Sequence, residues 1–299
     1  MNKKLGLLGV LLVVQLVLVA IALVIPLGDD DSAPQLLAFT SEQIDRLEIH
    51  DGSDEVVIRS EASGWRVAGV KADADKISDM LERLAGIDAP WPVATSSASA
   101  ARFEVSADDY QRRLRLYSAD EQIAEVFLGT SPGYERVHAR RSGSDEVFSV
   151  QLSNYELSAD VDSWMDKAVL AMDAPPTRIE MRKQVDDNIE VLESGDEGWL
   201  YNGAAADQDA AATYANRFTT LRVLGLASPA VDGAAPPTAI GQLQVANEAE
   251  NVTFLISRQG EEDDYFITVQ GSEVSYRLAT YIAEQLLMTD VEFTAQDED

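Results

Sequence analysis

The sequence has no cysteine, only two histidines, and few positive charges, with 23 lysine and arginine residues against 52 aspartate and glutamate residues. Without cysteine, disulfides, thiolate metal sites, cysteine nucleophiles and an N-terminal lipid anchor are excluded. With two histidines, a histidine-based zinc site would need carboxylates as its remaining ligands. The formal net charge of -29 at pH 7 excludes nucleic acid as an expected partner, because the phosphate backbone would be repelled.

No catalytic motif in the sequence has the local context that its chemistry requires. The sequence contains no glycine-rich loop of the kind that cradles phosphates, so we expect no nucleotide-driven activity. We therefore predict a protein that is not an enzyme and that carries no cofactor and no metal. Hydrophobic residues still make up 46% of the chain, which is enough to bury sizeable cores.

The longest uniform segment is an apolar run over residues 5–25, in which Gln15 is the only strongly polar side chain. As a helix, a run of this length covers roughly 30 Å, the thickness of the hydrocarbon core of a bilayer. Lys3 and Lys4 precede the run and favour a cytoplasmic N-terminus. We predict a single-pass anchor at residues 1–28 in the inner (cytoplasmic) membrane, with the C-terminal body on the periplasmic or extracytoplasmic side.

A cleaved signal peptide is the alternative interpretation, because Ala20 and Ala22 form an A-x-A pattern. The apolar cores of signal peptides usually run about 7 to 15 residues, so this longer run favours an uncleaved anchor. Residues 29–35 follow as an acidic linker, and residues 293–299 form an acidic tail.

The body of the chain is a tandem repeat, with a first module at residues 36–172 and a second at residues 173–292. Trp65 and Trp199 each follow a glycine at the same point of the repeat. We expect both tryptophans to anchor apolar cores, and the alternative is a platform for carbohydrate. The prolines at 175–176 mark the boundary between the modules.

The expected elements have the same order in both modules. They are strands at 44–49, 56–58 and 64–67 with a helix at 73–84, and strands at 179–181, 189–192 and 198–200 with a helix at 209–224. A loop that includes residues 95–101 and then short strands, the first at 103–105, follow in the first module. Helices at 156–170 and 275–288 close the two modules.

Most expected connections are as short as hairpins, which favours antiparallel pairing. We therefore predict an α+β fold. It consists of an N-terminal transmembrane helix and two tandem related modules of largely antiparallel sheet, with helices packed on one face.

The sequence resembles the bacterial domain of unknown function 4340 family. The resemblance rests on the N-terminal anchor, Gly64-Trp65, the stretch Val126-Phe127-Leu128-Gly129, Tyr134, Arg136, Val147-Phe148 and the closing segment from Trp164 to Leu170. Beyond the anchor, the resemblance covers most of residues 36–290, and the glycine and tyrosine landmarks are weaker in the second half. Members of that family are commonly encoded beside ABC-type exporters, so the resemblance implies an extracytoplasmic accessory role and supplies no catalytic residues.

We therefore expect a membrane-anchored accessory or interaction protein. Its expected partners are the subunits of an ABC-type transporter or another envelope complex, and Gln15 is a candidate for helix-to-helix contact within the membrane. An extracytoplasmic solute or glycan-binding protein is the alternative.

A remote alternative is an anchored serine hydrolase. Residues 129–133 match G-x-S-x-G and place Ser131 after a strand, with His138 seven residues downstream. A nucleophile elbow requires a helix directly behind the serine, but Pro132, Gly133 and a strand-like segment follow here. A hairpin loop is the favoured interpretation.

The candidate partner-binding residues are basic and alternate with apolar residues on two expected strands. They are Arg113, Arg115, Arg136, His138 and Arg140. Alternation places such side chains on one face of a strand, where arginines can bind an anionic group through forked hydrogen bonds. The alternative, which we favour, is pairing with Glu121, Glu125 or Glu135 on neighbouring strands.

Overall fold

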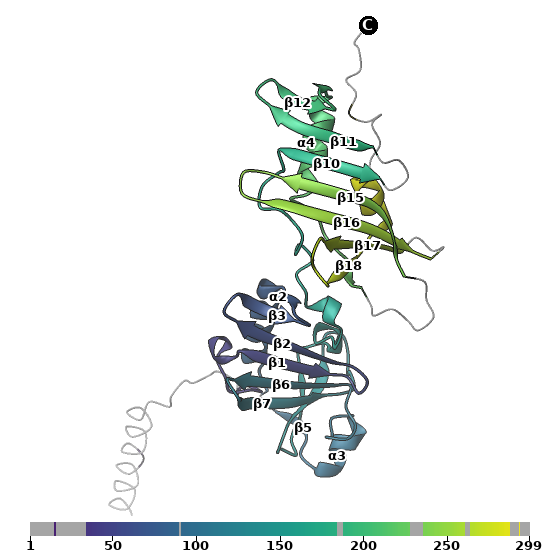
Figure 1. Cartoon of the computed structure of the whole chain (residues 1–299). Coiled ribbons are helices and arrows are strands. Elements are labelled where there is room, and N and C mark those ends of the chain that lie inside the picture. The colour runs from purple at the N-terminus through teal and green to yellow at the C-terminus, as the bar shows by residue number, and fades with distance from the viewer. Residues whose placement is uncertain are drawn as a thin grey trace, which may run out of the picture.

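The computed structural model describes residues 34–89, 91–183, 188–227, 236–260 and 264–287, together with Gln15 and Phe293. These residues form two antiparallel sheets of nine strands each, one in each half of the chain, with few helices. Figure 1 shows the two sheet modules arranged one after the other.

The first sheet has the strand order β4-β3-β2-β1-β6-β7-β8-β9-β5. Its strands are β1 (Arg46–His50), β2 (Glu55–Glu61), β3 (Gly64–Val67), β4 (Val70–Lys71), β5 (Pro92–Ala94), β6 (Arg112–Ser118), β7 (Glu121–Leu128), β8 (Val137–Arg141) and β9 (Val147–Val150). The helices of this half are η1 (Ser41–Gln43), α2 (Ala74–Ala85), α3 (Ser97–Arg102), η2 (Asn154–Glu156) and η3 (Val161–Ser163).

The second sheet has the order β13-β12-β11-β10-β15-β16-β17-β18-β14. Its strands are β10 (Arg178–Lys183), β11 (Ile189–Gly195), β12 (Gly198–Tyr201), β13 (Ala204–Ala205), β14 (Gly225–Leu226), β15 (Thr238–Ala246), β16 (Asn251–Gln259), β17 (Asp264–Val269) and β18 (Ser275–Leu278). Its helices are α4 (Gln208–Asn216) and α5 (Thr280–Leu286). Each strand of the second sheet occupies the position of the first-sheet strand whose number is nine lower. The predicted tandem repeat is therefore confirmed.

Matching caps start the main helix of each module. The side chain of Asp73 accepts the Lys76 N–H at 3.0 Å at the start of α2, and Asp207 does the same for Ala210 at the start of α4. After the last strand the chain returns to this cap. The Asp73 N–H donates to Trp164 O at 2.8 Å in the first module.

Each sheet buries one face, which we call the inner face, against the main helix of its module. In the first module Leu47, Ile58 and Leu114 join one core with Ile77 and Leu81 of α2. Strand side chains alternate between faces, so the outer face carries mostly polar groups. Helix α3 is an exception to the prediction that the helices pack on one face of the sheet. It covers part of the outer face in a separate small core, made by Ala100, Val105, Phe127 and Val147.

Four local predictions were wrong. The predicted helix at 209–224 ends early, because α4 stops at Asn216. Residues 97–102 are a helix rather than a loop, and only an isolated bridge forms at Val105. The predicted helix at 156–170 is replaced by two 3-10 turns, because Asp160 and Asp166 accept N–H groups two residues ahead, which competes with helix formation. The predicted helix at 275–288 is the strand β18 followed by the shorter α5.

In the part of the chain that the structure describes, no helix is long and apolar enough to cross a membrane. The predicted anchor lies outside the described residues except for Gln15, as do the linker residues 29–33 and the tail beyond Phe293.

The two modules meet where residues 160–172 pass between them. Asp162 Oδ1 accepts the Leu226 N–H at 2.8 Å, and the same carboxylate pairs with Arg277. Gly225 lies so close that an added Cβ would be 2.0 Å from Asp162 Oδ2. The Val223 N–H donates to Lys167 O at 2.9 Å. The junction is therefore built from specific polar contacts as well as packing.

Asp162→Ala should lower the free energy of unfolding by about 1 to 3 kcal/mol, because it leaves the Leu226 N–H and Arg277 without this acceptor. Urea unfolding measures the change. Glu273→Ala removes an exposed carboxylate of the second module and serves as the control. Equal losses in both variants would contradict this account of the junction.

Candidate functional site

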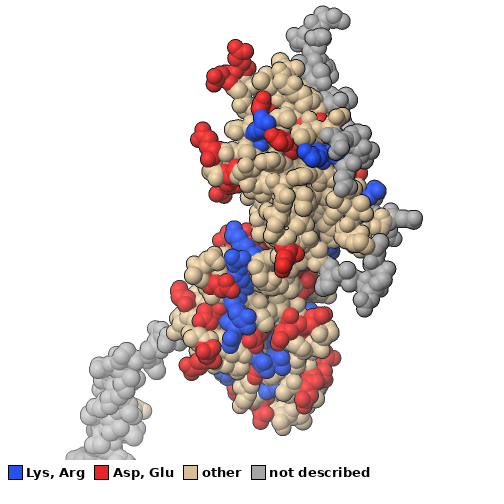
Figure 2. Space-filling view, viewed as in Figure 1, with Lys and Arg blue, Asp and Glu red and all other residues tan. Residues whose placement is uncertain are grey.

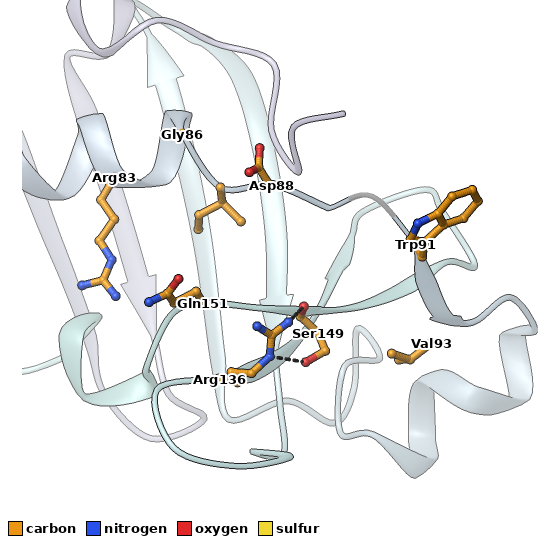
Figure 3. Close-up of a pocket in the computed structure, with 9 residues that line it drawn as sticks. Arg83, Gly86, Asp88, Trp91, Val93, Arg136, Ser149 and Gln151 are labelled. Carbon is orange, nitrogen blue, oxygen red and sulfur yellow. Dashed lines mark hydrogen bonds between the residues drawn. The ribbon is translucent and has the colours of Figure 1, made fainter. Parts of the chain in front are cut away.

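A groove of about 690 Å³ lies at one edge of the first module (Figure 3). The end of α2 and the loop after it supply Arg83, Gly86, Ile87 and Asp88. Trp91 lies just before β5, and Val93 lies within β5. Arg136, Ser149 and Gln151 complete the lining near β8 and β9. Figure 3 shows Arg83 and Trp91 at opposite ends, with Arg136 between them. The groove thus offers cationic and apolar surface side by side.

Exposed aromatic side chains surround this region. Trp91 is 83% exposed, Tyr134 is 89% exposed and Tyr155 is 91% exposed. Both tyrosines line a second hollow that shares Arg83 with the groove. We call these three residues the aromatic rim. Tryptophan, tyrosine and arginine are enriched at protein interfaces and dominate their binding energy.

The two arginines of the groove are held by the protein itself. Arg83 pairs with Glu156, whose other oxygen accepts the Ser153 N–H at 2.8 Å. Arg136 Nε donates to Ser149 Oγ at 3.0 Å, and Arg136 Nη2 donates to Ser149 O. A guanidinium has five N–H donors, so Arg136 is oriented by Ser149 and keeps donors for a bound group.

The groove lies beside the point where the described chain begins. The Leu36 N–H donates to Ile87 O at 2.8 Å, and the Ala89 N–H donates to Pro34 O at 2.8 Å. Residues 87–89 therefore join the groove to the segment that leads back toward the predicted anchor.

Only Arg136 among the five predicted residues lines this groove. Arg115 Nε instead lies 2.8 Å from Glu125 Oε1, and Arg113 lies 3.9 Å from Glu55. The hydrogen bond to Glu125 raises the pKa of Arg115. Burial opposes ionisation of Glu125, but hydrogen bonds from Arg115 and Ser142 outweigh it, so the pKa of Glu125 is lowered.

Arg140 and His138 point to the outer face, as alternation predicts, but α3 and the chain after it cover that face here. Arg140 Nε donates to Val105 O at 2.6 Å. His138 is only 8% exposed, its ring centroid lies 4.3 Å from that of Phe103, and its Nδ1 lies 2.9 Å from Thr130 Oγ1. Both side chains therefore contribute to packing between the strands and α3.

The G-x-S-x-G segment forms a turn between β7 and β8. Ser131 Oγ lies 2.7 Å from the carbonyl oxygens of Gly133 and Arg136, whereas His138 contacts Thr130. An added Cβ at Gly129 would lie 2.0 Å from Phe103 O, so glycine is required here for close backbone approach.

Sequence reasoning missed the aromatic rim. The prolines on both sides of Trp91 disfavour a helix around it, but no sequence pattern marks it as a site residue. Tyr134 and Tyr155 lie in turns far apart in sequence. Only folding places Tyr134, Tyr155 and Arg83 around one hollow.

The model of the family described as Domain of unknown function (DUF4340) matches residues 65–242, more than half of the chain. The match runs from the first module into the second and contains every residue that lines the groove. No curated protein and no solved structure matches the chain.

Gly129→Ala should destabilise the protein by at least about 2 kcal/mol, because the new methyl group meets backbone oxygen and cannot rotate away. Chemical unfolding tests the change. Among the described residues, nothing lies within 4 Å of a Cβ added at Gly133, so Gly133→Ala should be near neutral. Similar losses of unfolding free energy in the two variants would contradict a special packing role for Gly129.

Because of His138, the free energy of unfolding should fall as the pH drops below about 6.5. Burial lowers the pKa of His138 from the ordinary value of 6.5. Between the lowered pKa and 6.5 the unfolded chain binds more protons, so acid favours unfolding and the stabilising effect is complete above 6.5. His138→Gln should flatten this part of the pH profile, measured by urea unfolding at a series of pH values. An unchanged slope would contradict the assignment.

Proposed function

The chain belongs to the DUF4340 family, and on this premise we propose that it is a membrane-anchored, extracytoplasmic accessory protein that binds a partner protein and performs no catalysis. The proposed partner is a subunit of an ABC-type exporter or of another envelope complex. The groove with the aromatic rim is the proposed binding site.

The aromatic rim is the observation that carries this proposal. Exposed aromatic side chains gathered beside arginines are typical of the central residues of protein interfaces. Each rim residue is more than four-fifths exposed, so burial against a partner would remove much apolar surface from water.

The predicted anchor supports the same proposal, because only a short segment separates it from the groove. Pro34, whose carbonyl oxygen accepts the Ala89 N–H beside the groove, lies nine positions after Ile25, the end of the apolar run. Even when fully extended, a segment of this length reaches about 30 Å. The groove would stay near the membrane, where a short tether gives a high effective concentration of the membrane-bound partner.

A solute or glycan binder is the second candidate, and the size of the groove favours it. About 690 Å³ falls in the range of small-molecule sites, and Trp91 offers a flat apolar ring. A specific ligand must raise the melting temperature of the full-length protein. Trp65 and Trp199 instead pack against the main core, which disfavours the carbohydrate platform considered from the sequence.

The partner-binding proposal predicts that Trp91→Ala combined with Tyr155→Ala reduces co-purification of exporter subunits at least about tenfold. The assay is mild cross-linking in native membranes, followed by detergent extraction, affinity capture and mass spectrometry. Tyr281→Ala removes an aromatic side chain that is 62% exposed on the second module and should have no effect. Equal recovery from all variants would refute the site.

Deletion of residues 1–27 tests the role of the anchor separately. The released body should fold, because every described strand lies beyond this segment, and should no longer co-purify with its partner. Unchanged co-purification would refute the positional role of the anchor but leave the groove intact as a binding site.

A further inference from the structure

A row of four positive side chains crosses the outer face of the first sheet. The register places Lys71 opposite Arg66, Arg66 opposite Arg59, and Arg59 opposite Arg46 on four neighbouring strands. We call these residues the cation ladder. Figure 2 shows a band of lysine and arginine on the first module that extends toward the junction with the second.

The ladder lies on the face opposite α2. Its members alternate along their strands with buried residues, which are Val70, Val67, Ile58 and Leu47. Neighbouring strands are about 4.8 Å apart, so the row is about 14 Å long. It forms a row of positive charge on a protein whose formal net charge is -29.

This arrangement costs stability, because like charges directly opposite each other on neighbouring strands repel. The second module shows that the fold does not need it. The equivalent row reads Ala205, Leu200, Glu193 and Arg178, and there Arg178 forms an ion pair with Glu193. Two modules with one topology thus differ in charge at this position.

The ladder is only partly neutralised. Lys71 lies 2.8 Å from Asp166, and Arg46 lies 3.4 Å from Glu48 and over the ring of Tyr117. The central pair has no carboxylate partner within the described residues. Arg66 donates to Gly69 O and Ser63 Oγ, and Arg59 is exposed and makes no hydrogen bond or ion pair with the described chain.

We propose that the cation ladder is a second docking surface, which binds an acidic segment of a partner protein. Carboxylates three or four residues apart on a helix are separated by about 5 to 6 Å, close to the strand spacing of the ladder. Arginine binds carboxylates through two parallel hydrogen bonds, so Arg59 and Arg66 are the central contacts.

The acidic neighbours of the ladder favour discrete carboxylates over a continuous anionic surface. Glu61 follows Arg59 on the same face of β2, and Glu48 follows Arg46 on β1. An anionic bilayer would press negative charge against both. A helix with one acidic stripe meets only the line of cations. The proposal is independent of the groove and of the membrane anchor.

The experiment uses the full-length protein in neutral detergent and a fluorescent peptide of about 20 residues that repeats glutamate followed by three alanines. Fluorescence anisotropy at low salt measures the affinity. Arg59→Glu gives the ladder the ion pair found in the second module and should weaken binding at least about tenfold. Arg182→Glu makes the same charge change on an exposed residue of the second sheet and should change affinity less than about twofold.

Thermal unfolding supplies a second readout. Arg59→Glu should raise the melting temperature, because it replaces repulsion with attraction, so lost binding cannot be attributed to misfolding. Equal peptide affinity in the wild type and Arg59→Glu would overturn the proposal. Tighter Arg59-dependent binding of polyphosphate or of phosphatidylglycerol vesicles would also overturn it, in favour of a phosphate ligand.

Discussion

A nine-stranded sheet has an apolar face far wider than one helix covers, and the rest of the structure follows from this mismatch. Nine strands span about 40 Å, whereas a helix is about 10 Å wide. In the first module α2 covers only part of the inner face. The remainder is covered by chain without long helices, in which Leu36, Phe39, Leu157 and Trp164 are buried. The segments before and after the sheet are therefore structural parts of the module.

The same mismatch connects the core to the candidate site. The covering segments meet the end of α2 beside the groove, where Leu36 bonds to Ile87 and Arg83 pairs with Glu156. On the other side of the module, residues 160–172 pass from this cover into the contacts with the second module. In this view one module carries the groove and the cation ladder, and its repeat supplies a matched scaffold that lacks the ladder.

The repeat and the order of its first strands along the chain were predictable, because apolar alternation and the Gly-Trp landmarks occur at corresponding points in both halves. The structure of the polar segments that close the modules was not predictable. Asp160 and Asp166 form local side-chain bonds that prevent the helix that the apolar spacing at 156–170 predicts. His138 alternates as a surface residue does, yet it is only 8% exposed, because α3 forms where the sequence predicts a loop. The aromatic rim combines turns distant in sequence, so no local pattern could reveal it.

The central claim is that the groove beside the tether contacts a membrane partner, and site-specific photocross-linking in native membranes tests it most directly. A photoreactive residue would replace Trp91 in one variant and Tyr281 in another, with the adducts identified by mass spectrometry. The account predicts adducts with exporter or envelope subunits from position 91 and none from position 281. Adducts from both positions alike, or from neither, would contradict it.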